Sequence, residues 1–203
     1  PNWHHFSIGQ RIRFLEKCQE NKALIMEYHR RVRLMTAVAL VGLASVCVLG
    51  YHLTYGQLKP GFENFIAGRL VFEQLKMNPE NADLQVAAGD YHYARQNYSA
   101  AVGFYETAVY QTPDHVHALN NLAWLLATCP QTDLQDPERA LDLAGRAVVL
   151  APQSPFVLDT YAEALFVNHR IAEAVAAAQK ALQLSRDRRD YYQDQVRRFQ
   201  TYL

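Results

Sequence analysis

A spacing of 34 residues recurs through residues 80–185 and constrains the fold more than any other feature of the sequence. Small residues keep this register in three sets: Gly89, Ala123 and Ala162; Ala101, Ala140 and Ala174; and Ala108, Ala147 and Ala181. Each set shows one interval of 34 and one of 39 residues, so five extra residues lie between Ala123 and Ala140. Pro79, Pro113 and Pro152 follow at matching points, where a residue without a backbone donor ends a helix. The pattern predicts an all-α stack of helix pairs, since one pair cannot bury its apolar face alone.

The three units resemble the tetratricopeptide repeat (TPR) family. The first unit matches with Ala88-Gly89, Tyr98, Ala101, Tyr105, Ala108 and Pro113. The second matches with Leu119, Leu122-Ala123, Leu126, Ala140, Ala144, Ala147 and Pro152. The third matches with Leu158, Tyr161-Ala162, Leu165, Ala174, Ala178 and Ala181, and has Ser185 in place of the final proline. The resemblance implies a TPR helical-hairpin solenoid of about three repeats over residues 80–185. We expect a linker and partial repeat helix over 57–79 and a C-terminal capping helix over 186–203.

A second feature is the run of 25 residues between Arg33 and Lys59 that contains no Lys, Arg, Asp or Glu. Its centre, residues 36–53, is apolar apart from small hydroxyls and His52. The run exceeds the roughly 20 helical residues that a bilayer core requires. It therefore predicts a single transmembrane helix over residues 34–56. A buried core helix is less favoured because the run has no polar face, and a cleaved signal peptide because the preceding basic segment is too long.

The formal net charge of zero conceals an asymmetry between the two ends of the chain. Residues 1–33 carry seven basic and three acidic side chains, whereas residues 57–203 carry 13 basic and 17 acidic ones. The positive-inside tendency then predicts a cytoplasmic basic amphipathic helix over 1–33 and an extracytoplasmic repeat region, periplasmic in a bacterium. The N-terminal helix could lie on the membrane surface or dock against neighbouring membrane subunits, and the sequence leaves both open. Ser7 and Gln10 have the spacing of a helix-capping box.

The residues that could carry chemistry do not form a recognisable catalytic pattern. Cys18, Cys47 and Cys129 are far apart, and Cys129 has no base at a suggestive spacing, so a packing role is expected. His115 and His117 lack the further ligands of a metal site. No phosphate-binding loop or hydrolase motif occurs, and an acidic soluble part argues against nucleic acid. The sequence predicts a protein that is not an enzyme, with no cofactor, no metal and no small-molecule substrate.

The TPR resemblance also implies a concave groove lined by the first helix of each pair. Carrying the family's groove positions across gives Asp83, Val86, Asp90, Tyr93, His117, Asn120, Asn121, Trp124, Thr128, Phe156, Asp159, Glu163 and Phe166. Tyr93, Trp124 and Phe166 are candidate anchors for a partner, although Trp124 could equally fill the space between first helices. The family's chaperone-tail binders need cations in the groove, and Val86, Phe156 and Thr160 occupy those positions here. With four acidic positions, this groove is expected to prefer basic or neutral ligands.

Taken together, the anchor and the repeats predict a non-catalytic, membrane-anchored TPR scaffold that mediates protein–protein interactions. We expect it to act as an accessory or assembly subunit of a larger membrane protein complex, with other subunits and membrane lipid as partners. The alternative is an envelope biogenesis factor or chaperone-like adaptor that binds secreted or cofactor-bearing client proteins transiently. The bacterial inner membrane is the expected location.

Overall fold

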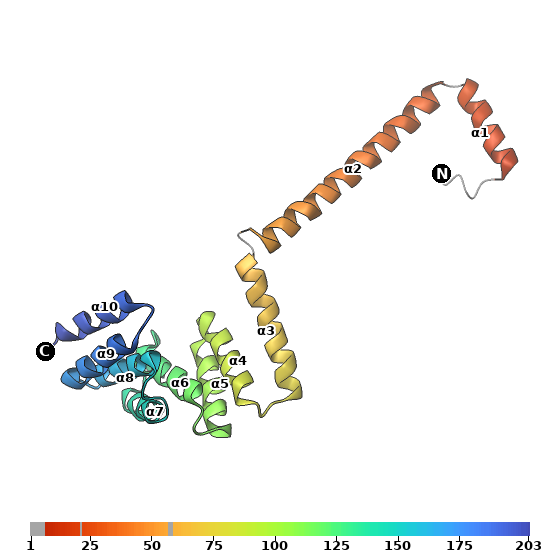
Figure 1. Ribbon diagram of the computed structural model, residues 1–203. Helices are drawn as coiled ribbons and strands as arrows, with labels where there is room; N and C mark the ends of the chain where they lie inside the picture. The colour runs from red at the N-terminus through yellow and green to blue at the C-terminus, as the bar shows by residue number, and fades with distance from the viewer. Residues whose placement is uncertain (1–6, 21, 57–58) are drawn as a thin grey trace. The chain divides into compact units, whose positions relative to one another are not determined.

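The computed structural model describes residues 7–20, 22–56 and 59–203, and the regular elements of these residues are all helical (Figure 1). The chain divides into two compact units, residues 1–64 and residues 65–203. The boundary falls inside one helix, α3, which runs from Lys59 to Met77. The predicted all-α fold class is confirmed.

The first unit contains two helices, α1 (Ile8–Glu20) and α2 (Lys22–Thr54). The predicted capping box opens α1: the Gln10 amide hydrogen bonds the Ser7 hydroxyl oxygen at 3.4 Å. In return, the Ser7 amide donates to Gln10 Oε1 at 2.9 Å. The remainder of the segment predicted as a basic helix, up to Arg33, belongs to α2. The Lys and Arg residues from Lys22 to Arg33 therefore share one continuous helix with the apolar run, whereas the earlier ones lie in α1.

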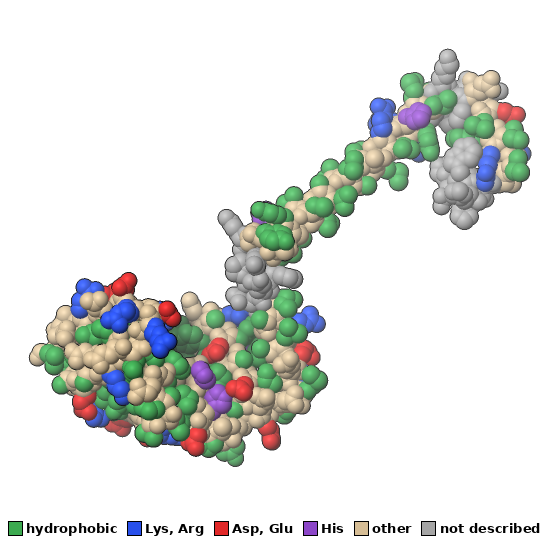
Figure 2. All heavy atoms as spheres, viewed as in Figure 1, with side chains coloured by type: hydrophobic (Ala, Val, Ile, Leu, Met, Phe, Trp, Pro, Cys, Tyr) green, Lys and Arg blue, Asp and Glu red, His purple; other side chains and the backbone are tan. Residues whose placement is uncertain are grey.

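Helix α2 has 33 residues and is long and apolar enough, from Ile25 to Thr54, to cross a membrane. At about 1.5 Å per residue it extends roughly 50 Å. Figure 2 shows hydrophobic side chains along most of its surface. Its serine and threonine side chains, of Thr36, Ser45 and Thr54, each donate a hydrogen bond to the carbonyl four residues earlier, at 2.7–2.9 Å. These polar groups are thus satisfied inside the helix, as an apolar surrounding requires.

The second unit is a stack of helical hairpins. Its pairs are α4 (Ala82–Ala94) with α5 (Tyr98–Gln111), α6 (Val116–Thr128) with α7 (Pro137–Leu150), and α8 (Pro155–Val167) with α9 (Ile171–Leu184). Each pair packs most extensively within itself, and α5 meets α6 as α7 meets α8 (Figure 1). The first helices also touch one another, α4 on α6 and α6 on α8. The predicted repeat of three helix pairs is confirmed.

The small residues that set the 34-residue register are the points where these helices approach. All eight alanines of the register are fully buried, at 0% exposure. The ninth position, Gly89, is buried too, and a Cβ there would lie only 2.4 Å from the Tyr105 ring. The 34-residue periodicity therefore arises from packing between helices and not from a general abundance of small residues.

The five-residue insertion lies in the connection between α6 and α7. It contains a 3₁₀ turn, Thr132–Leu134, and folds back so that the Asp136 amide donates to the Leu126 carbonyl at 3.1 Å. Asp136 then caps α7, whose first residue is Pro137, by accepting from the Arg139 amide at 3.0 Å. Cys129 is buried in the core at the end of α6, whereas Cys47 is exposed on α2.

Two further helices flank the hairpins within the second unit. The C-terminal part of α3 packs on α4 and α5 through Phe72, whose ring contacts those of Tyr91, His92 and Phe104. At the other end, α10 (Arg189–Gln200) packs on α9 and buries Tyr192, Val196 and Phe199. Both ends of the hairpin stack are thereby covered.

Candidate functional site

The first helices α4, α6 and α8 line one side of the stack and carry all thirteen groove positions. Side chains join α4 to α6 through polar contacts between residues about one repeat apart. Asn121 Nδ2 donates to Asp90 Oδ1 at 2.9 Å, and Trp124 Nε1 donates to the Tyr93 hydroxyl oxygen at 3.2 Å. These bonds hold the inner surface of the groove in a defined arrangement.

A pocket of about 330 Å³ opens between these helices. Seven of the predicted positions line it: Asp90, Tyr93, Asn120, Asn121, Trp124, Phe156 and Asp159. The remaining lining comes from Tyr105, Thr160, Arg188 and Tyr191. The pocket therefore gathers aromatic rings and carboxylates from the first helices of all three pairs.

The other six predicted positions lie outside this pocket. Val86 is buried in the core, and the Thr128 hydroxyl donates to the Trp124 carbonyl within α6. His117 stacks on the pocket residue Phe156, with ring centroids 5.5 Å apart. Phe166 packs against Phe199 and Tyr202 at the C-terminal end of the chain.

The last two of the six, Asp83 and Glu163, are acidic and pair within the chain. Asp83 lies 2.9 Å from His115 Nε2, and the His115 Nδ1 atom accepts from the Ala118 amide. Glu163 is buried and pairs with Arg198 of α10. Only Asp90 and Asp159 thus bring carboxylates to the pocket itself.

Sequence reasoning missed the contribution of α10 and the turn before it. Tyr191 donates its hydroxyl hydrogen to Asp159 Oδ2 at 2.8 Å, and Arg188 lines the same pocket. Spacing could have found Tyr191, since it lies 32 residues after Asp159, much as Asn121 lies 31 after Asp90. Arg188 has no such signal, because its position depends on a left-handed backbone at the start of α10.

Burial controls the ionisation of the pocket. Removal from water raises the pKa of Asp159 to about 6, although the Tyr191 hydrogen bond acts in the opposite direction. Burial, with the neighbouring carboxylates, also raises the pKa of the Tyr105 and Tyr191 phenols. Both phenols therefore stay protonated at neutral pH and serve as donors to Asp90 and Asp159.

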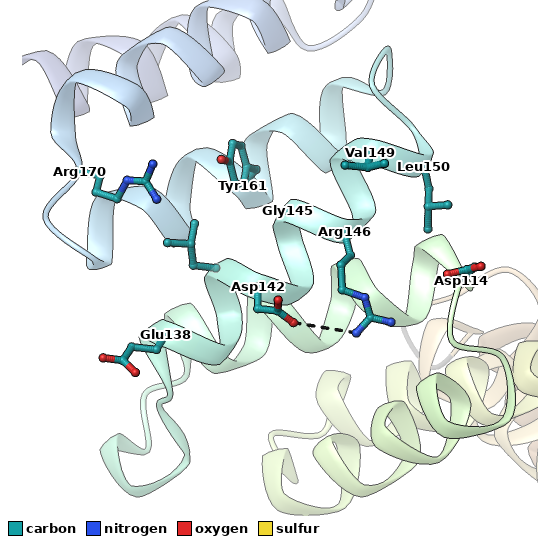
Figure 3. A pocket seen from close by; sticks show the side chains of 10 residues that line it. Asp114, Glu138, Asp142, Gly145, Arg146, Val149, Leu150, Tyr161 and Arg170 are labelled. Carbon is teal, nitrogen blue, oxygen red and sulfur yellow. Dashed lines mark ion pairs between the residues drawn. The ribbon is translucent and has the colours of Figure 1, made fainter.

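A larger hollow, of about 730 Å³, lies over α7 (Figure 3). Its two cationic side chains are already engaged: Arg146 Nη2 donates to the Pro113 carbonyl at 2.8 Å, and Arg170 forms an ion pair with Glu173. Arg146 also lies 4.0 Å from Asp142, as the dashed line in Figure 3 marks. Because its cations have partners within the chain, this hollow is the weaker candidate.

Residues 7–20, 22–56 and 59–203 contain no group of three or more His, Cys, Asp or Glu side chains that could hold a metal ion. Cys129 is enclosed by core residues, and its carbonyl accepts from Gln135 Nε2 at 2.8 Å.

No protein-family model and no curated protein matches the chain. Among solved structures, the crystal structure of the Sgt2 TPR domain from Aspergillus fumigatus is similar, with a TM-score of 0.53 and 21% sequence identity. The match covers 60% of this chain and 78% of that chain. The repeat unit has a TPR-like fold.

Proposed function

We propose that this protein is a non-catalytic, membrane-anchored scaffold whose TPR-like groove binds a partner protein within a larger membrane complex. The observation that carries the proposal is the pocket between α4, α6 and α8, where exposed Tyr93 and Phe156 flank polar side chains. Aromatic anchors beside satisfied hydrogen-bonding groups are the usual composition of a protein-binding hot spot.

Anchoring is the second part of the proposal. Helix α2 is long enough to span a bilayer, its apolar side chains are exposed, and its serine and threonine hydroxyls are bonded internally. In this arrangement residues 34–56 cross the membrane, residues 1–33 lie in the cytoplasm, and residues 80–185 present the groove on the extracytoplasmic side. Alkaline carbonate extraction tests it: the chain is expected in the membrane pellet, and release into the supernatant would contradict anchoring.

Site-specific crosslinking tests the groove in the full-length chain. Benzoylphenylalanine in place of Phe156 is expected to give a discrete adduct with one partner in native membranes. The matched control places the same group at Tyr110, which is 87% exposed but lies on α5, outside the pocket. Equal adducts at both positions, or none at position 156, would contradict groove binding.

Stoichiometry decides between the two kinds of scaffold. Purification in mild detergent is expected to recover the crosslinked partner in a fixed ratio if the chain is a subunit of a complex. Recovery that is substoichiometric and dependent on expression of a client protein would instead favour the transient biogenesis adaptor.

A further inference from the structure

The pocket of the groove combines aromatic walls with two carboxylates. The rings of Tyr93, Trp124, Phe156 and Tyr191 line it together with Asp90 and Asp159. Aromatic faces attract cations through their quadrupole, and carboxylates attract them by charge. This composition is complementary to a cationic group rather than to an anion or a purely apolar side chain.

Neither carboxylate has a cation paired with it. Asp159 is only 9% exposed and accepts one hydrogen bond, from the neutral Tyr191 hydroxyl. Asp90 accepts from Tyr105 and Asn121, both at Oδ1. Among the described residues no Lys, Arg or His nitrogen lies within 4.0 Å of either carboxylate. A buried carboxylate without a paired cation is unfavourable. A cationic ligand would therefore supply the positive charge that Asp159 lacks.

The side-chain amide of Asn120 adds a separate observation. Asn120 is 6% exposed and lines the pocket, and its Nδ2 donates to Asn121 Oδ1 at 3.2 Å. Its Oδ1 atom is buried, and no hydrogen bond reaches it from the described residues. An amide oxygen left in this way lacks the donor that buried acceptors usually have.

The chain itself shows which cation the pocket attracts. The Arg188 guanidinium lies 4.5 Å from the centroid of the Tyr191 ring, and Arg188 lines the pocket. Its backbone adopts a left-handed conformation (φ 57°), which non-glycine residues seldom occupy. The guanidinium contacts one aromatic wall but forms no ion pair with Asp159, so it occupies the pocket incompletely.

We propose that this pocket binds an arginine side chain from a segment of the partner protein, with Arg188 as an internal competitor. This inference rests on the proposed function of the groove. A guanidinium suits the pocket because its plane stacks on aromatic rings while its five N–H donors reach several acceptors at once. The bound arginine stacks between aromatic rings, pairs with Asp159 and Asp90, and displaces Arg188 toward solvent.

The test uses the full-length chain in lipid nanodiscs and the tripeptide acetyl-alanyl-arginyl-alanyl-amide. The matched probe carries citrulline, which has nearly the same shape but no charge. Saturation-transfer NMR, with empty nanodiscs as background, gives the affinity of each. The arginine peptide is expected to bind at least about five times more tightly than the citrulline peptide, since it adds an ion pair and a cation–π contact.

Variants locate the binding. Asp159→Asn is expected to weaken arginine binding roughly five-fold, and Arg188→Asn to strengthen it about two- to three-fold by removing the competitor. Asn tolerates the left-handed backbone at position 188. Asp194→Asn makes the same charge change at an exposed ion pair of α10 outside the pocket, and is expected to leave binding unchanged. Phe156→Leu removes an aromatic wall at a partly exposed position outside the core, so the variant is expected to fold and to bind more weakly.

Equal binding of the two peptides would overturn the proposal, as would equal effects of Asp159→Asn and Asp194→Asn. The outcome is separable from that of the proposed function. If the partner crosslinks at position 156 as strongly in the Asp159→Asn chain as in the wild type, binding in the groove is supported and the arginine proposal is contradicted. Absence of any adduct at position 156 in the wild type would remove groove binding itself.

Discussion

At the α4–α6 end of the groove, Asp90 is exposed and held by the neutral donors Tyr105 and Asn121, whereas at the α8–α10 end Asp159 and Glu163 are buried. Contacts between neighbouring inner helices join residues 31 to 35 positions apart at both ends. The partner helix differs, however: α6 is apolar with small residues, whereas α10 is rich in arginine and tyrosine. The same repeat geometry thus gives an open end, where Asp90 accepts from neutral donors, and a closed end, where Arg198 pairs with the buried Glu163.

The closed end depends on α10, so removal of its main anchor has the largest expected effect. Phe199 is fully buried, and its ring lies 4.9 Å from that of Phe166. Phe199→Ala is expected to lower the free energy of unfolding by about 3–5 kcal/mol, because it leaves a cavity under α10. Urea denaturation of the full chain in detergent, followed by circular dichroism, measures the change. Tyr202→Ala, at an exposed ring of the same end, is the control, and equal losses would show that α10 is not anchored by burial.

Next in size is the loss of charge compensation at the closed end. Arg198 pairs with Glu163, whose side chain is 8% exposed, whereas Arg139 and Glu106 pair at 2.6 Å with both side chains above 40% exposed. Arg198→Met is expected to destabilise the fold by about 2–3 kcal/mol at pH 7, since it leaves a buried carboxylate unpaired. Arg139→Met removes an exposed pair and should cost about 1 kcal/mol or less. Thermal unfolding of both variants checks the contrast, and similar losses would contradict it.

The third prediction concerns pH and Asp159. Its pKa is raised to about 6 from an ordinary value of 3.8, so between these values the folded state binds more protons than the unfolded state. The stabilisation from protonated Asp159 is complete below pH 3.8 and is lost as the pH rises through 6. Asp159→Asn removes this dependence and keeps an acceptor for Tyr191. Relative to wild type, the variant should therefore gain roughly 2 kcal/mol between pH 4 and pH 7. If the free energy of unfolding of the variant and the wild type varied with pH in parallel across this range, the raised pKa of Asp159 would be ruled out.

The smallest predicted effect concerns two glycines of the first helix pair, Gly89 and Gly103. Gly89→Ala places a Cβ against the Tyr105 ring and displaces the donor to Asp90, so a loss of about 1–2 kcal/mol is expected. Gly103→Ala, on the exposed side of α5, meets nothing within 4 Å and should stabilise the helix by up to about 1 kcal/mol. Opposite signs in the melting temperatures support this packing; a shared sign speaks against it.

The sequence predicted the hairpin stack well because its signal is local and repeated. Ala101, Ala140 and Ala174 each sit where two helices touch, and the close approach admits only small side chains. Seven groove positions meet in one pocket for the same reason, since the register fixes which side of α4, α6 and α8 they occupy.

The features that the sequence did not predict depend on contacts that do not follow the repeat spacing. Arg198 neutralises Glu163 because α10 takes the place of a further inner helix, and Arg188 reaches the pocket through one left-handed residue. The expectation that the groove prefers basic or neutral ligands, drawn from its four acidic positions, overlooked these partners. All four carboxylates contact side chains that sequence reasoning had not assigned to the groove: Asp83 contacts His115, Asp90 contacts Tyr105, Asp159 contacts Tyr191 and Glu163 contacts Arg198.

The insertion between α6 and α7 has a consequence for how such a chain can vary over evolution. Its 3₁₀ turn sits at the tip of a hairpin, and residues on both sides are fixed by their own contacts, Cys129 in the core and Asp136 at the start of α7. Length can be gained or lost at this tip without moving any later repeat out of phase. The same site suits an epitope tag or a fluorophore between Thr132 and Asp133, which would report on the protein in living cells while leaving its groove untouched.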